Sequence, residues 1–144
     1  MRYNAVVSIL LFFFITGCST ALVPLSEAVA VPFARIQAFQ TQTDVTSATI
    51  IIIRDKGFVG SACRLSFYLD GVLAAQIGPR QTARFYVEPG DHLVRAEGGG
   101  GGAPGCGLNK NTGATRETTL KRGETKVFRI STDASGSIDV QRAA

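Results

Sequence analysis

Turn signals recur at short, even intervals from Thr46 onward, and they separate segments rich in β-branched and aromatic residues. The Asp70-Gly71 pair is the clearest of them, because a type I′ hairpin turn needs positive φ at both of its central residues. Gly78-Pro79, Pro89-Gly90 and the stretch 121–124 supply further turns. Short strands with a turn about every eight to twelve residues predict an all-β fold, an antiparallel β-sandwich of seven or eight short strands.

The individual strands follow from residue type and alternation. Residues 46–54 are mostly β-branched and include four consecutive isoleucines, which is typical of a central strand buried on both faces. Alternation places Leu65, Phe67 and Leu69 on one face of the next strand, and Ala83, Phe85 and Val87 on the inner face of a later one. The predicted strands are 46–54, 64–70, 72–77, 82–88, 92–97, 115–120, 126–131 and 137–142.

Composition limits the remaining choices. The chain has 144 residues, of which 45% are hydrophobic and 18% are charged, enough for one domain with a buried core. Fifteen Lys and Arg residues against eleven Asp and Glu give a formal net charge of +4. This excess is small and scattered, whereas nucleic-acid binding needs a clustered basic face, so no nucleic-acid partner is expected.

The N-terminus has the pattern of a secretory signal peptide. Arg2 precedes an apolar run, residues 5–15, that only Ser8 interrupts. A helix of this length rises about 16 Å, roughly half of the hydrocarbon core, and does not span a bilayer. A charged start, a short apolar run and small residues after it predict export and cleavage.

The residues that follow are more specific. Ile15-Thr16-Gly17-Cys18 resembles the lipobox of bacterial lipoproteins, in which the cysteine is lipidated and becomes the first residue after cleavage. The resemblance implies a diacylglycerol on Cys18 and an acylated amine, and two or three acyl chains anchor a protein stably. Ser19 follows in place of Asp, which implies the outer membrane, facing the periplasm. The alternative is an ordinary secreted protein with a chance cysteine.

Three regions are therefore expected. Residues 1–17 form a lipoprotein signal peptide, residues 18–45 a lipidated N-terminus and flexible tether, and residues 46–144 the β-sandwich domain. The tether contains Pro24, Pro32 and many small residues. Its apolar residues Phe33, Ile36 and Phe39 predict either a short helical turn or an edge segment, and both alternatives stay open.

Cys63 and Cys106 remain once Cys18 is assigned to lipid, and both would lie in an oxidising compartment. A disulfide between them closes a loop worth about 4 kcal/mol in the chain-entropy model. The competing interpretations are a metal site or a catalytic thiol. A single histidine and the absence of a CxxC motif argue against a metal, and no residue is placed to activate a thiol. No metal, cofactor or catalytic residue is expected.

The stretch from Ala48 to Val140 resembles the small β-sandwich domain of unknown function found in bacterial lipoproteins and related to the PEGA domain. Four segments carry the resemblance: Ile51-Ile52-Ile53-Arg54, Phe67-Tyr68-Leu69-Asp70-Gly71, Phe85-Tyr86-Val87-Glu88-Pro89-Gly90-Asp91-His92 and Leu120-Lys121-Arg122-Gly123-Glu124-Thr125. The resemblance implies a fold and a location in the cell envelope. It implies no catalytic residues.

Two motifs have simpler interpretations. The glycine run at 98–102 with Gly105 formally contains G-x-G-x-x-G, but the residues after it have no helical pattern, so a dinucleotide site is not expected. A flexible loop is the prediction. His92, the single histidine, lies beside the Pro89-Gly90 turn and is expected in a solvated or packed position.

A candidate contact surface combines two features. Phe58 and Val59 lie in a glycine-punctuated loop that the disulfide would join to the glycine-rich loop at one end of the sandwich. Arg84 and Arg95 are expected to face outward on neighbouring strands and to form a basic patch for lipid phosphates or cell-wall carboxylates. The alternatives are that Phe58 folds over the edge of the core and that the arginines serve only solubility.

The function expected from these features is that of a non-enzymatic, lipid-anchored lipoprotein of the cell envelope. It would act as an accessory or binding module whose partners are the membrane, through its lipid anchor, and an envelope protein or cell-wall component. A mainly structural or surface-modifying lipoprotein without a tight ligand is one alternative. A small periplasmic hydrolase is the other, since a sandwich can carry catalytic groups.

Overall fold

Strand β2 (Ala48–Arg54) is the centre of the fold and is buried at every position. The computed structural model describes residues 20–57, 60–108 and 113–143. In it β2 pairs antiparallel with β5 (Gln81–Val87) and parallel with β8 (Thr125–Thr132). The prediction of a central strand buried on both faces is confirmed.

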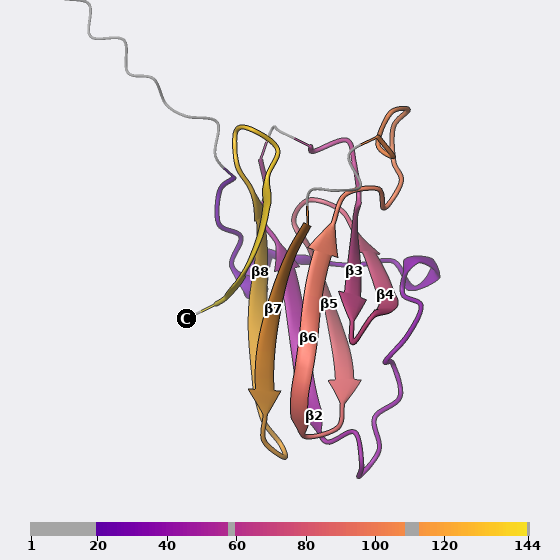
Figure 1. Ribbon diagram of the computed structural model, residues 1–144, viewed down its shortest axis with the longest axis vertical. Coiled ribbons are helices and arrows are strands. Elements are labelled where there is room, and N and C mark those ends of the chain that lie inside the picture. The colour runs from indigo at the N-terminus through magenta and orange to yellow at the C-terminus, as the bar shows by residue number, and fades with distance from the viewer. Residues whose placement is uncertain (1–19, 58–59, 109–112, 144) are drawn as a thin grey trace, which may run out of the picture.

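Two sheets face each other across the core (Figure 1). The five-stranded sheet has the order β1-β5-β2-β8-β9, with β1 at Val29–Ala30 and β9 at Ile138–Arg142. The four-stranded sheet has the order β4-β3-β6-β7. Its strands are Val72–Ile77 (β4), Leu65–Leu69 (β3), Gly90–Glu97 (β6) and Gly113–Leu120 (β7). The β-sandwich arrangement agrees with the prediction, and each predicted strand is present.

Pairing direction differs from the prediction at two places. The four-stranded sheet is antiparallel throughout, but β2–β8 and β1–β5 are parallel pairs, which makes the five-stranded sheet mixed. The cause is that the turns after β5 and β7 carry the chain from one sheet to the other. β8 therefore returns to the five-stranded sheet in the direction of β2.

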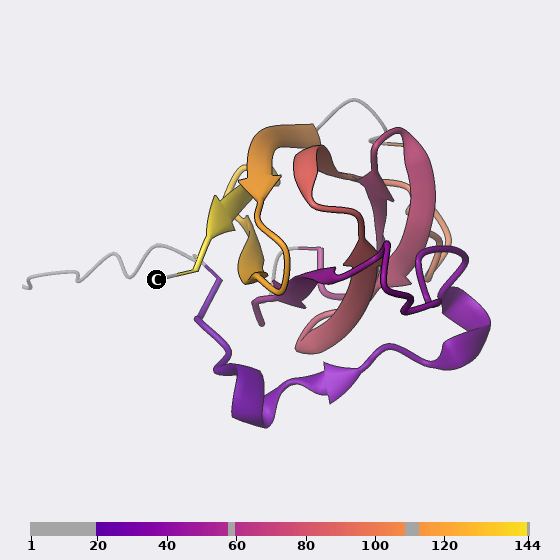
Figure 2. The same cartoon turned by 90° about the horizontal axis from the view of Figure 1, so that it is seen from below.

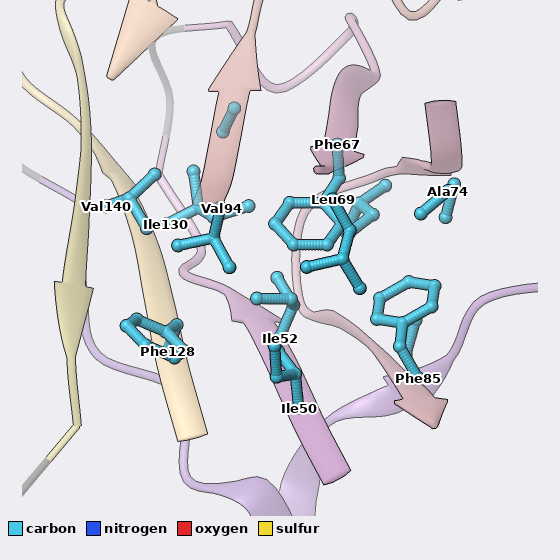
Figure 3. Packing of buried hydrophobic residues seen from close by; sticks show 14 of the residues in the cluster. Ile50, Ile52, Phe67, Leu69, Ala74, Phe85, Val94, Phe128, Ile130 and Val140 are labelled. Atoms are coloured by element: carbon cyan, nitrogen blue, oxygen red, sulfur yellow. The ribbon is translucent and has the colours of Figure 1, made fainter. Parts of the chain in front are cut away.

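The core lies between the sheets, and its largest side chains come from both of them (Figure 3). Phe67 of β3 stacks on Phe85 of β5 with ring centroids 5.2 Å apart. The predicted inward residues are buried, and the six are Leu65, Phe67, Leu69, Ala83, Phe85 and Val87. Asp70 (φ 51°) and Gly71 (φ 80°) both have positive φ, as the predicted hairpin turn requires.

The N-terminal segment packs across the outside of the five-stranded sheet (Figure 2). Ala21 pairs with Lys56, and Val23 packs on Ile51 and Ile53, which point away from the main core. A flexible tether over residues 18–45 was expected, whereas residues 20–31 lie on this sheet and residues 36–37 pair with β4 at the edge of the other sheet. The physical reason is that the outer isoleucines of β2 would otherwise face water.

Short turns complete this segment. Leu25–Glu27 (η1) and Phe33–Arg35 (η2) are 3₁₀ helices. Both alternatives for this stretch are therefore realised: a helical turn begins at Phe33, and Ile36 then forms an edge bridge with Ala75 of β4. Within residues 20–57, 60–108 and 113–143, no helix has the length and apolar character needed to cross a bilayer.

Candidate functional site

The Cys63–Cys106 disulfide joins two loops at one end of the sandwich, with Cα atoms 5.3 Å apart. The predicted pairing is confirmed. This end, called here the disulfide end, comprises residues 54–57 and 60–64, the glycine-rich loop 98–108, residues 78–80 and the turn 133–137. The strands β2, β4, β6 and β8 all finish there, at the top of Figure 1.

The glycine-rich loop is held in place by backbone contacts. Arg64 N donates to Gly101 O (2.7 Å), Gly100 N donates to Arg64 O (3.0 Å), and Cys63 forms a bridge with Gly102. A Cβ at Gly100 would lie 2.7 Å from the carbonyl carbon of Leu65, so only glycine fits this close approach. The sequence predicted a flexible loop here, whereas the described part of it lies against residues 62–65.

Arg54 closes the core at this end and joins the two sheets. It belongs to β2, is 3% exposed, and donates from Nη1 to Cys63 O (2.7 Å) and Ile77 O (2.9 Å) and from Nη2 to Gly60 O (2.9 Å). Burial lowers the pKa of the guanidinium to about 10, so the group stays charged at neutral pH. Three carbonyl oxygens stabilise this charge in place of a carboxylate.

A small pocket of about 250 Å³ lies beside Arg54 and the disulfide. Apolar side chains and glycine backbone form most of its wall; the lining includes Leu65, Gly98, Gly99, Gly136 and Ile138. Arg54 is the charged residue on this wall. Its guanidinium donates to three carbonyl oxygens of the protein, and these contacts explain its position without any ligand in the pocket.

A larger groove, of about 870 Å³, opens between the two sheets toward the opposite end. Strands β6 and β7 form one side and β8 and β9 the other. Its lining mixes both charges and hydroxyl groups and contains Asp70, Asp91, His92, Leu93, Arg116, Glu117, Thr118, Thr119, Lys126, Phe128 and Arg142. Such a lining suits a polar partner surface more than an apolar small molecule.

Asp70 and His92 meet at one wall of the groove. Asp70 Oδ2 lies 2.7 Å from His92 Nδ1, and Asp70 Oδ1 accepts a hydrogen bond from Leu93 N (2.8 Å). The second ring nitrogen, Nε2, lies 2.7 Å from Glu88 O and donates to it, because a carbonyl oxygen only accepts. Both imidazole nitrogens are thus engaged within the protein.

This geometry limits the chemistry of the groove. An Asp–His pair is part of many hydrolase sites, but there the second ring nitrogen is free to take a proton from a nucleophile. Here that nitrogen is bound to Glu88 O, and the pair fastens the β3–β4 turn to β6. The described residues also contain no group of three His, Cys, Asp or Glu side chains arranged to hold a metal ion.

The other polar groups of the groove are also fixed. Thr119 Oγ1 donates to Asp91 Oδ1 (2.5 Å), and Lys126 Nζ donates to Thr119 O (2.5 Å). Arg116 Nε donates to Val140 O (2.8 Å) and so ties β7 to β9 across the opening. These contacts within the chain hold the polar side chains around the groove in fixed positions.

The predicted basic patch of Arg84 and Arg95 does not form. Arg84 projects from the outer face of the five-stranded sheet, and Arg95 from the outer face of the four-stranded sheet. The expectation was wrong because the Pro89-Gly90 turn crosses between sheets, so β5 and β6 are neighbours in sequence and not in space. Arg95 pairs instead with Glu97 (2.5 Å).

Glu97 has a second contact on this face, with Tyr68. Burial, reinforced by the hydrogen bond to Glu97, raises the pKa of the Tyr68 phenol above its ordinary value. The three residues form a local surface cluster on the four-stranded sheet and lie outside both the groove and the disulfide end.

Three predicted site residues lie outside the described residues: Cys18, Phe58 and Val59. Sequence reasoning missed the Asp70–His92 pair and the role of Arg54. The register of β3 against β6, which sets Leu69 opposite Val94, brings the turn after β3 close to His92, but this register is not readable from one sequence. For Arg54, the signal was a charged residue at the end of an otherwise apolar central strand.

Comparison with known proteins gives no relative: no family model, no curated protein and no solved structure matches this chain. The function is therefore argued from the residues and the geometry.

Proposed function

We propose that this chain is a non-enzymatic, lipid-anchored lipoprotein of the cell envelope, in the outer membrane facing the periplasm, that binds an envelope partner. The anchor is the acylated Cys18, and the contact surface for the partner is the groove between β6–β7 and β8–β9. The fixed polar lining of this groove, with both nitrogens of His92 engaged, is the observation that carries the binding role.

The sequence around Cys18 supports the anchor, and the oxidised pair Cys63–Cys106 is compatible with a compartment outside the cytoplasm. The resemblance of residues 48–140 to the PEGA-related lipoprotein domain points the same way. A small hydrolase is disfavoured because the one histidine of the chain has no free ring nitrogen.

Intact mass of the membrane-extracted protein tests the anchor. We expect a mature chain that starts at Cys18 and carries acyl chains, with no alkylatable thiol until reduction. The Cys18→Ser chain is the control and should retain residues 1–17 without acyl mass. A wild-type chain that starts elsewhere would contradict the anchor.

Site-specific photo-crosslinking tests the binding role. A photoreactive side chain at Thr118, which faces Lys126 across the groove, is compared with one at Phe33, which is 81% exposed on the N-terminal segment. A discrete adduct from position 118 and none from position 33 is expected in intact envelopes. Adducts from neither position would favour the alternative of a structural lipoprotein without a tight ligand.

A further inference from the structure

The lipid anchor and the disulfide end are close along the chain. Two peptide units separate Cys18 from Thr20, so the two Cα atoms are at most about 7 Å apart. Thr20 packs on Gly57, where an added Cβ would lie 2.7 Å from Thr20 Cγ2. Ala21 N donates to Lys56 O (2.6 Å), and Lys56 N donates to Ala21 O (3.1 Å). Acyl chains on Cys18 would therefore hold the disulfide end near the bilayer.

The same end carries cations without acidic partners. Lys56 and Arg80 are exposed and Arg64 is half-buried, and none of the three takes part in an ion pair within the described parts of the chain. Arg35 approaches from η2. Burial, and then the charge of Arg64, lower the pKa of Arg35, which shows that these two cations are neighbours.

The acidic groups of the disulfide end are outnumbered by its cations. Asp55 is paired with Arg129, while Asp133, which accepts hydrogen bonds from Ser135 and Ser137 within its own turn, keeps its negative charge against Lys56, Arg64 and Arg80. The buried guanidinium of Arg54 adds a further positive charge behind this surface. The end therefore presents a positive potential to its surroundings.

An apolar side chain projects from the same surface. Leu108, at the end of the described part of the glycine-rich loop, is 86% exposed. Cations around a projecting leucine match the interface of an anionic bilayer, where phosphates attract basic side chains and the acyl boundary accepts apolar ones.

We propose that the disulfide end is a membrane-docking surface that rests on the headgroups of the leaflet holding the acyl chains of Cys18. Lys56, Arg64 and Arg80 contact lipid phosphates, and Leu108 enters the interface. This inference rests on the lipidation proposed above. It gives the domain a fixed orientation in which the β7–β8 turn at Arg122, at the other end of the sandwich, points away from the bilayer (Figure 1).

Depth-dependent quenching on the lipidated protein tests the orientation. The mature protein is reconstituted in vesicles of phosphatidylglycerol and phosphatidylcholine with a nitroxide on the headgroup. An encoded fluorescent side chain at Leu108 should be quenched severalfold more than one at Arg122. Equal quenching, or stronger quenching at Arg122, overturns the docking proposal while leaving the lipidation intact.

Vesicle sedimentation tests the charge contribution without the anchor. The unlipidated chain from Ser19 onward is prepared with its disulfide oxidised. It should bind phosphatidylglycerol vesicles and lose binding as the salt concentration rises. Lys56→Glu with Arg80→Glu should weaken binding about tenfold or more. Lys121→Glu with Arg122→Glu, the same change of net charge at the opposite end, should have a much smaller effect.

The outcomes separate the two proposals. An intact mass without acyl chains overturns the lipidation, and the sedimentation experiment then still decides the docking surface by itself. Equal losses for the two charge-reversed pairs, or binding that is indifferent to salt, overturn the docking surface. Circular dichroism of both pairs verifies that the variants are folded.

Discussion

Asp55 and Arg129 form an ion pair that fastens the N-terminal segment to the five-stranded sheet. The Asp55 side chain is fully buried, Arg129 Nε lies 3.3 Å from its Oδ1, and the same oxygen accepts a hydrogen bond from Val23 N (3.3 Å). The carboxylate thus connects the end of β2, strand β8 and Val23 of the N-terminal segment.

Asp55→Ala should lower the free energy of unfolding by roughly 3 kcal/mol, because it leaves the Arg129 charge and the Val23 amide without their partner. Chemical denaturation measures the change. Asp139→Ala is the matched control, since its pair with Arg116 is exposed on both sides and should contribute about 0–1 kcal/mol. Equal effects of the two substitutions would show that burial of the pair is unimportant.

Replacing Cys63 and Cys106 together by serine should lower the free energy of unfolding by about 4 kcal/mol, as expected for a loop with a sequence separation of 43. Urea denaturation of the oxidised protein, the reduced protein and the double variant measures it. The reduced protein and the double variant should agree. A loss below about 1 kcal/mol would mean that the backbone contacts of the glycine-rich loop already hold this end.

Gly100→Ala should be destabilising by about 1–3 kcal/mol, because its methyl group would overlap the Leu65 and Arg64 backbone. Gly107→Ala is the control in the same loop, where an added methyl group meets nothing within 4 Å. Thermal denaturation of both variants compares them. A neutral Gly100→Ala would contradict the packing of this loop against β3.

Arg54→Met should destabilise the protein by about 2–4 kcal/mol, because the buried carbonyl oxygen of Ile77 and the partly buried ones of Cys63 and Gly60 lose their donor. Arg54→Lys should recover only part of this loss, because a single ammonium group cannot donate to all three carbonyl oxygens as the planar guanidinium does. Hydrogen exchange at the ends of β2 and β4 locates the damage. Exchange that rises only at the opposite end of the sandwich would count against this role.

The turn between β8 and β9 should be sensitive to acid. Hydrogen bonds from the Ser135 hydroxyl and the Ser137 amide hold the pKa of Asp133 below its ordinary value. A depressed carboxyl pKa contributes stability at pH values above the unfolded pKa, and this contribution is lost as the pH falls through the folded pKa. An NMR titration of the Ser135 and Ser137 amides should show a midpoint below the ordinary pKa of an aspartate side chain. In Asp133→Asn the amide signals should show no such titration, because the side chain no longer ionises.

The strands were predictable because local signals determine them. Alternation marked the inner faces of Phe67 and Phe85, and the Asp70-Gly71 pair marked its turn. The partners of a strand depend on how distant segments meet, and so the parallel pairing of β2 with β8 was not predictable. The same reason explains the error over Arg84 and Arg95.

The disulfide followed from cysteine counting, but the close contacts at Gly100 depend on the approach of another loop. The packing of the N-terminal segment was missed for a related reason. The isoleucine run predicts a strand buried on both faces, but it does not say what covers the outer face, and the residue that does so, Val23, lies far from it in sequence.

The place of β2 between β5 and β8 determines when the chain becomes protected from aggregation during folding. If the chain emerges N-terminus first, both cysteines are available for oxidation before residue 125, where β8 begins. Until then Ile50–Ile53 form a strand of high β propensity with one open edge, which is the kind of segment that associates with other chains. Chaperones should therefore be needed most for chains that stop short of β8, and C-terminal truncations should be cleared more rapidly than point variants of equal stability.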